Sequence, residues 1–299
     1  MSIGLPTFNR DRALERAIAS VLAQDYRDIE LVISDNASTD GTAALCRRHA
    51  EADARVRYFA QPVNRGPVAN FIEVLQRARG ELFMWLGDDD WLDASYVRLC
   101  VEALRADPAL SLVGGAAKYY TSTGSFLPGY AMNLTQDSPA ARVLRYYASV
   151  GDNAIFYGVM PLELARRVAC RNCLGGDWLF VAAMAYLGKV KTLDETALHR
   201  ELGGASASRA SIAEALGLPA VQFVLPFSSV AANAALDIAH RNPVYRERPA
   251  IGRGLLACAV LLQVLVSKGL VLNFKLVAVR LMRWVMGDER YRRLRERIR

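Results

Sequence analysis

This sequence of 299 residues lacks several features that mark special classes of protein. Only 22% of the residues are charged and 53% are hydrophobic, which excludes a disordered, collagen-like or low-complexity chain. No internal repeat is present, which argues against a solenoid or a propeller. The strongly apolar, nearly uncharged run at residues 255–266 has about twelve residues, whereas a helix that crosses a bilayer needs about 20. We therefore expect a globular protein with a sizeable core and no transmembrane helix.

The sequence also lacks the marks of an exported or zinc-binding protein. Its first residues contain no basic segment followed by a long apolar one, so we expect no signal peptide. The five cysteines are an odd number, and only Cys170 and Cys173 have the CxxC spacing of a zinc ribbon. A ribbon needs a second such pair. We therefore expect free thiols in a reducing compartment.

The first 240 residues have no net positive charge, although the net charge of the whole chain is +7. Residues 1–240 carry 23 basic and 26 acidic side chains, whereas residues 241–299 carry 14 basic and 4 acidic ones. The basic tail, residues 290–299, lacks the interleaved aromatic side chains on which nucleic-acid bases stack, apart from Tyr291. We therefore expect no nucleic-acid partner.

The first 120 residues alternate between strand-like and helix-like segments. Compact apolar runs predict strands at residues 2–5, 29–34, 56–60, 81–87 and 111–120. Apolar residues at helical spacing predict helices at residues 12–24, 40–52, 67–77 and 94–105. Such alternation indicates βαβ units. The predicted fold class is therefore α/β, with a mostly parallel sheet flanked by helices.

The pattern changes after residue 120. Helix-compatible patterns return at residues 154–168 and 178–187, and residues 201–211 are small, polar and rich in Gly and Ser. The latter composition predicts a mobile loop or linker. Beyond it the chain has a helical pattern throughout. We therefore expect two domains, residues 1–210 and a helical, basic C-terminal region of residues 211–299.

Polar residues follow each of the first four predicted strands. They are residues 6–10 (PTFNR), 35–42 (DNASTDGT), 64–66 (NRG) and 87–91 (GDDDW). Ligands of open α/β sheets bind beyond the carboxyl ends of the strands, and parallel strands end at one edge. These four loops are therefore expected to converge on one site.

Three consecutive aspartates, Asp88, Asp89 and Asp90, follow the fourth predicted strand. Their charges repel one another unless they share a cation, and carboxylate oxygens suit Mg²⁺ or Mn²⁺, which then bridges to phosphate oxygens. The alternative is a solvated turn in which Asp90 or Asp93 caps the next helix. The three other polar loops favour the metal site.

In this order and spacing, the four motifs resemble those of family 2 glycosyltransferases of the GT-A fold, over roughly residues 1–205. The resemblance implies a nucleotide-diphospho-sugar donor, with Thr7 and Asp35 near the nucleobase and ribose and Arg65 near the nucleotide. It also implies that the acidic triplet is the DxD element. Many members have Asp-x-Asp-Asp where this chain begins with Gly87, so which two aspartates act stays open. The expected nucleotide-sugar-binding residues are Pro6, Thr7, Asn9, Arg10, Asp35, Asn36, Arg65, Asp88, Asp89 and Arg200.

An inverting sugar transfer also needs a general base that removes the proton of the acceptor hydroxyl. The segment GGDWLF resembles the family's Glu-Asp-Trp segment, with Gly176 in place of Glu, so the resemblance implies Asp177 as the base. Asp177 is also a candidate N-cap of a helix from Trp178, and both roles are compatible. His199 and Arg200 lie where many members have a loop that closes over the diphosphate. The resemblance implies that His199 joins Asp88 and Asp90 at the metal, and that Arg200 neutralises the leaving group; the alternative for His199 is a solvated side chain.

The C-terminal region combines apolar helices with basic residues. Trp284, the aliphatic residues and the interspersed Lys and Arg favour helices that lie in a membrane interface, with residues 290–299 meeting anionic lipid headgroups. The alternative is a buried helical hairpin that packs on the catalytic domain or on a second copy in a homo-oligomer.

Together these patterns predict an inverting glycosyltransferase dependent on Mn²⁺ or Mg²⁺, cytoplasmic and peripheral at the inner face of the cell membrane. Its acceptor would be a carbohydrate or lipid-linked molecule in the synthesis of cell-surface polysaccharide or glycolipid. A sugar-nucleotide nucleotidyltransferase is an alternative, but that class needs a Gly-rich loop after the first strand, and residues 6–10 contain no Gly. A non-catalytic nucleotide-sugar-binding module is a third interpretation, against which the intact triplet and Asp177 argue.

Overall fold

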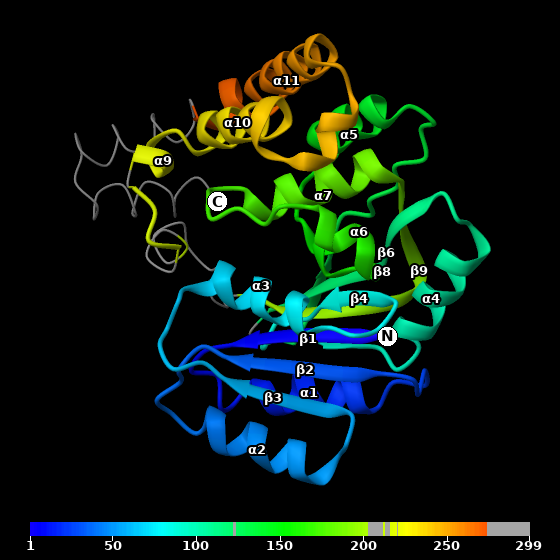
Figure 1. Ribbon diagram of the computed structural model, residues 1–299, viewed down its shortest axis with the longest axis vertical. Coiled ribbons are helices and arrows are strands. Elements are labelled where there is room, and N and C mark those ends of the chain that lie inside the picture. The colour runs from blue at the N-terminus through cyan, green and yellow to red at the C-terminus, as the bar shows by residue number, and fades with distance from the viewer. Residues whose placement is uncertain (122–123, 203–211, 213–215, 220, 274–299) are drawn as a thin grey trace.

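Five strands form the central sheet, in the order β3-β2-β1-β4-β8 (Figure 1). The computed structural model describes residues 1–121, 124–202, 212, 216–219 and 221–273 of the chain. The first four strands are parallel, and β8 is antiparallel to β4. Their bounds are β1 (Ser2–Thr7), β2 (Glu30–Asp35), β3 (Val56–Ala60), β4 (Leu82–Trp85) and β8 (Met160–Pro161).

Alternate residues of these strands enter two different cores. Ile3, Leu5 and Met84 belong to one hydrophobic cluster, whereas Val32 and Trp85 belong to the other. This is the period-two alternation of a strand that is buried on both faces. Three helices, α1 (Leu14–Leu22), α2 (Thr42–Ala52) and α4 (Tyr96–Ala106), contribute to the first cluster, and α3 (Pro67–Arg77) contributes to the second. The predicted α/β fold with helices on both faces is confirmed.

A second, four-stranded sheet has the order β5-β9-β6-β7. Its strands are β5 (Trp91–Leu92), β6 (Leu110–Tyr120), β7 (Phe126–Pro128) and β9 (Lys189–Glu201). Strand β9 runs parallel to β6, and its end pairs with β5, so that His199 lies opposite Trp91. The sequence patterns did not predict β9. This strand brings residues 199 and 200 beside the loop that holds the aspartate triplet.

The described part of the segment between β6 and β9 contains four helices, each with buried residues. It contains α5 (Pro139–Ser149), the 3-10 helix η1 (Ala154–Tyr157), α6 (Leu162–Arg167) and α7 (Gly176–Leu187). The helix-compatible pattern at residues 154–168 proves to be η1, β8 and α6 in succession, since Gly158 and Pro161 interrupt it. Helix α7 is buried from Leu179 to Ala185, which explains why its sequence is apolar on all sides.

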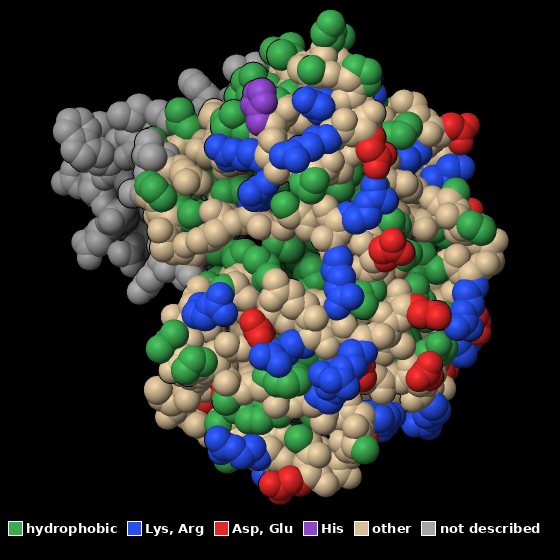
Figure 2. Space-filling view, in the orientation of Figure 1, with side chains coloured by type: hydrophobic (Ala, Val, Ile, Leu, Met, Phe, Trp, Pro, Cys, Tyr) green, Lys and Arg blue, Asp and Glu red, His purple; other side chains and the backbone are tan. Residues whose placement is uncertain are grey.

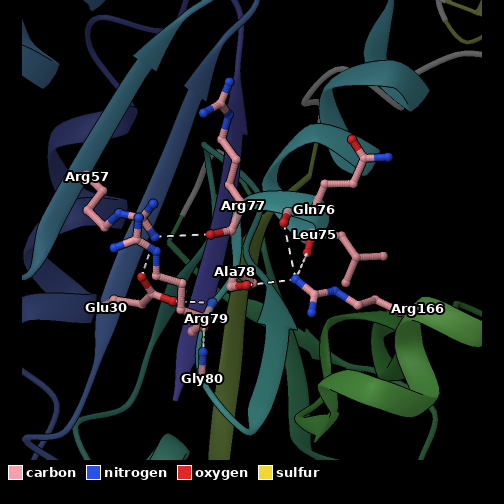
Figure 3. Close-up of polar contacts among 10 residues, drawn as sticks. Glu30, Arg57, Leu75, Gln76, Arg77, Ala78, Arg79, Gly80 and Arg166 are labelled. Atoms are coloured by element: carbon pink, nitrogen blue, oxygen red, sulfur yellow. Dashed lines mark hydrogen bonds and ion pairs between the residues drawn. The ribbon is translucent and has the colours of Figure 1, made fainter.

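Charged side chains fix the edge of the central sheet at which its parallel strands begin (Figure 3). Arg57 bridges Glu30 and the carbonyl of Arg77, at 2.6 and 3.0 Å. Arg166 of α6 donates to three further carbonyls around the end of α3, those of Leu75, Gln76 and Ala78. Carbonyl groups at a helix C-terminus lack intrahelical partners, and cations there are favourable. These arginines are therefore structural.

The C-terminal helices pack on the side of α5 and α7 that faces away from the central sheet (Figure 1). They are α9 (Val221–Val224), α10 (Pro226–Leu236), η2 (Asp237–Arg241), η3 (Pro243–Glu247), α11 (Ala250–Val264) and η4 (Leu265–Asn273). The predicted helical character is confirmed over the described part of this region. Of the loop predicted at residues 201–211, Glu201 proves to be the last residue of β9, and residues 203–211 lie outside the described residues, as does the basic tail at residues 290–299.

The helix of residues 250–269 differs from expectation in its length. Ala250–Gly269 is a 20-residue helix of mean hydropathy 1.9, long and apolar enough to cross a membrane by length and composition. The helix is thus longer than the apolar run of about twelve residues from which its length was expected, because it continues beyond that run on both sides. One face packs on protein through four buried residues: Leu256, Ala257, Val260 and Val264. The exposed large side chains of this helix are Ile251, Leu255, Leu262 and Val266.

Candidate active site

The loops after the first three strands are joined by hydrogen bonds at the carboxyl edge of the central sheet. The backbone N–H of Asn36 donates to the carbonyl of Thr7 at 3.0 Å, and the backbone N–H of Arg65 donates to Asn36 Oδ1 at 2.9 Å. The buried Asn70 of α3 donates to the carbonyls of Thr7 and Ser34. Thr7 Oγ1 reaches the fourth loop, where it donates to Asp88 Oδ2 at 2.9 Å. The predicted convergence of four loops is confirmed.

Asp35 and Asn9 hold two of these loops in shape. Both oxygens of the buried Asp35 are engaged: Oδ2 accepts from Tyr58 Oη, and Oδ1 accepts from the backbone N–H of Ser38, each at 2.9 Å. Asn9, at a φ of 53°, accepts from the backbone N–H of Thr39 and donates its own backbone N–H to Ser38 Oγ. Asn tolerates this left-handed conformation better than most residues. Asn9 therefore links the first loop to the second.

Three further predicted nucleotide-binding residues, Pro6, Arg10 and Arg65, differ in burial and in their distance from the aspartate triplet. Pro6 is buried within β1, opposite Ser34 of β2. Arg10 Nε lies 3.5 Å from Asp88 Oδ1, so this guanidinium faces the triplet. The Arg65 guanidinium is more than half exposed and lies 3.8 Å from Glu73. Only Arg10 among these three side chains contacts the aspartates.

The aspartates of the triplet have perturbed ionisation. Burial, reinforced by the charge of Asp89, raises the pKa of Asp88 to about 7, although Thr7 and Arg10 oppose the shift. Burial also raises the pKa of Asp90 to about 6, against the opposing charge of Arg200. Carboxylates that are hard to ionise alone, at the end of a strand, are typical of a site that a cation completes.

Asp90 faces inward toward Arg200. Its side chain is 2% exposed, and Arg200 Nε lies 3.2 Å from Oδ1 and 3.1 Å from Oδ2. Only the contact to Oδ1 is a hydrogen bond, so Oδ2 is a buried atom that accepts none. A Cβ at Gly87 would lie 2.6 Å from the same Oδ2. The inward position of Asp90 is therefore compatible with Gly at position 87, where the family that these motifs resemble often has Asp.

A divalent cation fits these residues in a limited way. Among the described residues, no group of three or more His, Cys, Asp or Glu side chains is arranged to hold a metal. Mg²⁺, however, is commonly held by one or two carboxylates together with substrate phosphates. Asp88 and the unsatisfied Oδ2 of Asp90 are donors of that kind. The protein thus supplies part of a coordination shell that phosphate oxygens would complete.

The structure does not bring His199 into such a shell. Its Nε2 lies 2.7 Å from Asp93 Oδ1, its Nδ1 lies 3.0 Å from Tyr120 Oη, and its ring stacks on Trp91. Both ring nitrogens are engaged, so neither faces Asp88 or Asp90. The expectation that His199 joins these aspartates as a ligand disagrees with this geometry. Sequence position alone did not reveal that His199 lies in a strand paired with β5.

Asp177 lies in a cavity of about 470 Å³ beside Arg200. Hydrophobic side chains line the hollow between the helical half of the molecule and the central sheet (Figure 2). Its aromatic wall consists of Phe71, Trp85, Phe156, Tyr157, Trp178, Phe180 and Phe227. Arg200 lines this cavity and contacts Asp90, so it connects the cavity to the aspartate triplet.

The start of α7 determines how Asp177 enters the cavity. The helix begins at Gly176, with Gly175 as its N-cap at a φ of 80°, so Asp177 lies inside the first turn and is not the N-cap. A Cβ at Gly176 would collide with the carbonyl oxygen of Arg171, which explains why Glu is absent there. Asp177 is exposed to the cavity, and desolvation by the protein around it raises the pKa of its carboxyl, against a hydrogen bond from Asn153.

Two groups of cavity residues were not predicted from the sequence. Asn153, Phe156 and Tyr157 lie in residues 121–175, where no motif is recognisable. Pro226, Phe227 and Val230 come from α10 in the C-terminal region. No sequence signal points to them, because their position depends on packing between segments far apart in the chain.

The two sheets, the acidic triplet after β4 and the carboxylate in the adjoining cavity together define a protein of the GT-A class. Residues 2–164 match the model of the family described as "Glycosyl transferase family 2". The match covers more than half of the chain, which therefore belongs to this family of glycosyltransferases. The predicted resemblance is confirmed, and the nucleotidyltransferase alternative is not supported.

Curated proteins of similar sequence match this chain over part of their length. The chain is 40% identical over 93 residues to a GalNAc(5)-diNAcBac-PP-undecaprenol beta-1,3-glucosyltransferase of Campylobacter jejuni, which covers 31% of this chain and 30% of that protein. It is 30% identical over 157 residues to the putative colanic acid biosynthesis glycosyl transferase WcaA of Escherichia coli, or 52% of this chain and 56% of that protein. The chain thus spans well under two thirds of these relatives.

Solved structures share the fold over a larger share of the chain. The structure of residues 1–349 of S. aureus TarS matches with a TM-score of 0.65 at 15% identity, covering 97% of this chain and 79% of that one. A second structure of the same protein, in complex with UDP-GlcNAc, matches with a TM-score of 0.64 at 16% identity, covering 88% and 72%. At this identity the likeness establishes the fold.

Proposed function

We propose that this protein transfers a sugar from a nucleotide-diphospho-sugar to an acceptor hydroxyl, with inversion at the anomeric carbon. The observation that carries the proposal is one continuous arrangement: the aspartate triplet contacts Arg200, and Arg200 lines the cavity that contains Asp177. A donor whose diphosphate lies at the triplet would present its sugar to this cavity. The complex of TarS with UDP-GlcNAc supports a nucleotide sugar as the ligand of such a fold.

The donor side of the site would hold the diphosphate through charge. Asp88 and Asp90 are the residues that would hold Mn²⁺ or Mg²⁺, and the cation would stabilise the negative charge of the diphosphate when bound. Arg200 is already paired with Asp90 and can turn toward the leaving phosphate as its charge develops. The fixed loops of Asp35 and Asn9 offer a ready surface for the nucleoside.

Asp177 would act as the general base on the acceptor side. In the transfer, an acceptor oxygen forms a bond to the anomeric carbon while the bond from that carbon to the diphosphate oxygen breaks. The electron pair leaves with the diphosphate, and the acceptor proton passes to a carboxylate oxygen of Asp177. Its raised pKa suits this role, because a base works best when its pKa lies closer to the operating pH.

The cavity also indicates the kind of acceptor. Its aromatic wall suits the apolar faces of sugar rings or an acceptor with an apolar carrier. The relative from C. jejuni has an undecaprenol-linked molecule in its name, which supports a lipid-linked acceptor. The exposed apolar residues of α11 and the excess of positive charge in residues 241–299 support a location at the inner face of the cell membrane. On this proposal, residues 1–210 form the catalytic domain and residues 211–299 form a C-terminal region that contributes α10 to the cavity.

A thermal-shift screen with UDP, UDP-GlcNAc, UDP-glucose and GDP-mannose, with and without Mn²⁺, tests donor binding, because a bound ligand stabilises the fold by mass action. The Asp177→Asn variant then tests the base: turnover should fall by about 10²-fold or more while the thermal shift persists. Asp194→Asn, the same change at an exposed position of β9, is the matched control. Normal turnover of the Asp177→Asn variant would refute the assignment.

A further inference from the structure

Asn153 lies between Asp177 and the buried Tyr146. Asn153 Nδ2 donates a hydrogen bond to Asp177 Oδ2 at 2.9 Å, and Tyr146 Oη donates one to Asn153 Oδ1 at 2.7 Å. The three residues come from α5, from the position before η1, and from the first turn of α7. Two hydrogen bonds thus connect the protein core to the carboxylate in the cavity.

The chemistry of the two neighbours determines which way the Asn153 amide points. Tyr146 is fully buried, and burial raises its pKa well above the usual value, so its hydroxyl keeps its proton and donates. A carboxylate on the other side can only accept. The reversed amide would place the Asn153 carbonyl against the carboxylate, with two acceptors facing each other. The observed orientation is therefore strongly favoured.

The side chain of Asn153 does not cap the 3-10 helix η1 that follows it. Asn153 occupies the N-cap position of η1, where an Asn side chain commonly accepts a hydrogen bond from the turn. Here the side chain makes no such bond, and only the backbone carbonyl accepts, from the N–H of Phe156. Its side-chain hydrogen bonds within the described part of the chain go to Tyr146 and Asp177. A purely structural cap does not explain this arrangement.

We propose that Asn153 is a positioning residue, which Tyr146 orients and which holds Asp177 Oδ2 so that the other carboxylate oxygen is left for the acceptor. The proposal rests on the proposed function in one respect, namely that Asp177 is the base. The hydrogen bond from Asn153 favours the charged carboxylate, whereas desolvation by the protein around Asp177 favours the neutral acid. Asn153 therefore has two effects on Asp177, on its orientation and on its charge.

The other titratable groups around Asp177 keep one charge state near neutral pH. Arg200 of β9 faces Asp177 and stays positive. Burial raises the pKa of the neighbouring tyrosines and of one thiol, so they stay neutral: Tyr146 and Tyr147 of α5, Tyr157 of η1 and Cys173 before α7. Asp90, with a pKa of about 6, acts on this region through Arg200. A titration must therefore observe Asp177 itself.

Carbon-13 NMR of protein labelled at the aspartate carboxyl carbons observes Asp177 directly. Its resonance is assigned by its loss in Asp177→Asn, and the titration is run with EDTA and without any donor. Asn153→Ala should raise the pKa of Asp177 by about one unit, because it removes a hydrogen bond to the charged form. Tyr146→Phe should raise it by less, and the double variant should match Asn153→Ala alone, since links of one chain are not additive.

Asn172→Ala is the matched control. Asn172 lies near the cavity, but its amide donates to the backbone carbonyl of Leu216 and contacts neither Asn153 nor Asp177. It should leave the Asp177 titration unchanged. Asn153 is only half-buried, so Asn153→Ala remains a valid test even where the loss of a core hydroxyl in Tyr146→Phe unfolds the protein.

Enzyme kinetics separate positioning from donor binding. With UDP-GlcNAc and Mn²⁺ as the probe, Asn153→Ala should lower kcat for UDP release by about 10- to 100-fold and leave the donor KM within about twofold. The acidic limb of the kcat profile should move to higher pH by the NMR shift. An Asp177 titration in Asn153→Ala that coincides with the wild type overturns the proposal, whether or not sugar is transferred. Full turnover in Asp177→Asn overturns the proposed function instead.

Discussion

Removing the charge of Asp88 should stabilise the metal-free protein at neutral and alkaline pH. Asp88 has a folded pKa of about 7, while an aspartate in the unfolded chain has one near 3.8. Because the folded pKa is the higher one, the folded state binds the proton more tightly. The contribution of this group is therefore most favourable below pH 3.8 and is lost as the pH rises from there through about 7.

The magnitude follows from the size of the shift. Three pKa units correspond to about 4 kcal/mol, and this is an upper limit for Asp88→Asn because the charge of Asp89 contributes to the same shift. An Asn side chain can still accept the hydrogen bond that Thr7 Oγ1 donates, so the variant keeps its main contact. The gain should be largest near pH 8, smaller at pH 5 and close to zero near pH 4.

Urea unfolding in EDTA at pH 4, 5 and 8 measures this directly, with Asp194→Asn as the exposed control. A free energy of unfolding that is lower in Asp88→Asn than in the wild type at pH 8 would refute the reasoning, as would a difference independent of pH. Adding Mn²⁺ and UDP should reverse the order of stability, because the wild type then binds ligand more tightly.

Three further changes test other parts of the site. Gly87→Asp restores the residue common in the family but should lower Mn²⁺-dependent turnover, because its Cβ would displace the Asp90 carboxylate; a gain in turnover would contradict this. His199→Gln should cost about 1–3 kcal/mol in unfolding experiments while the Mn²⁺ concentration for half-maximal activity changes less than about twofold, since His199 contacts Asp93 and Tyr120 and not the triplet. Replacing Leu255 and Leu262 by Ser should lower the affinity for anionic vesicles, measured by co-sedimentation, about tenfold or more without lowering the free energy of unfolding. Leu127→Ser on β7 changes a similarly exposed side chain and should alter neither quantity.

The part of the site that could be predicted is the part built by local rules. The strand at residues 56–60 and the helix at residues 67–77 match the structure to the residue, since an apolar run and a Pro in the first helical turn define their limits. The four loops converge because parallel strands end at one edge. Family resemblance added the roles of the aspartates, which spacing alone left open between a cation site and a solvated turn.

The part that could not be predicted depends on contacts between distant segments. Strand β9 has polar residues at irregular intervals, and its pairing with β6 shifts register between Gly115 and Ala116, so no clean alternation marks it. Its pairing with β5 is what turns His199 toward Asp93. The proposed role of Asn153 could not be predicted either, because it depends on contacts with Tyr146, seven residues earlier, and Asp177, 24 residues later.

The C-terminal region is more than an attachment to the proposed catalytic domain. Phe227 and Val230 of α10 line the cavity, and the Val230 side chain lies 3.0 Å from where a Cβ on Gly175 would be. Lys268 of η4 lies 5.6 Å from the centre of the Trp178 ring. The boundary expected near residue 210 therefore divides the chain but not the site. On the proposed function, if α11 rests on a membrane, then α10, which packs on α11 and lines the cavity, would lie near the lipid, so an acceptor with an apolar carrier would have a short path from the bilayer to Asp177.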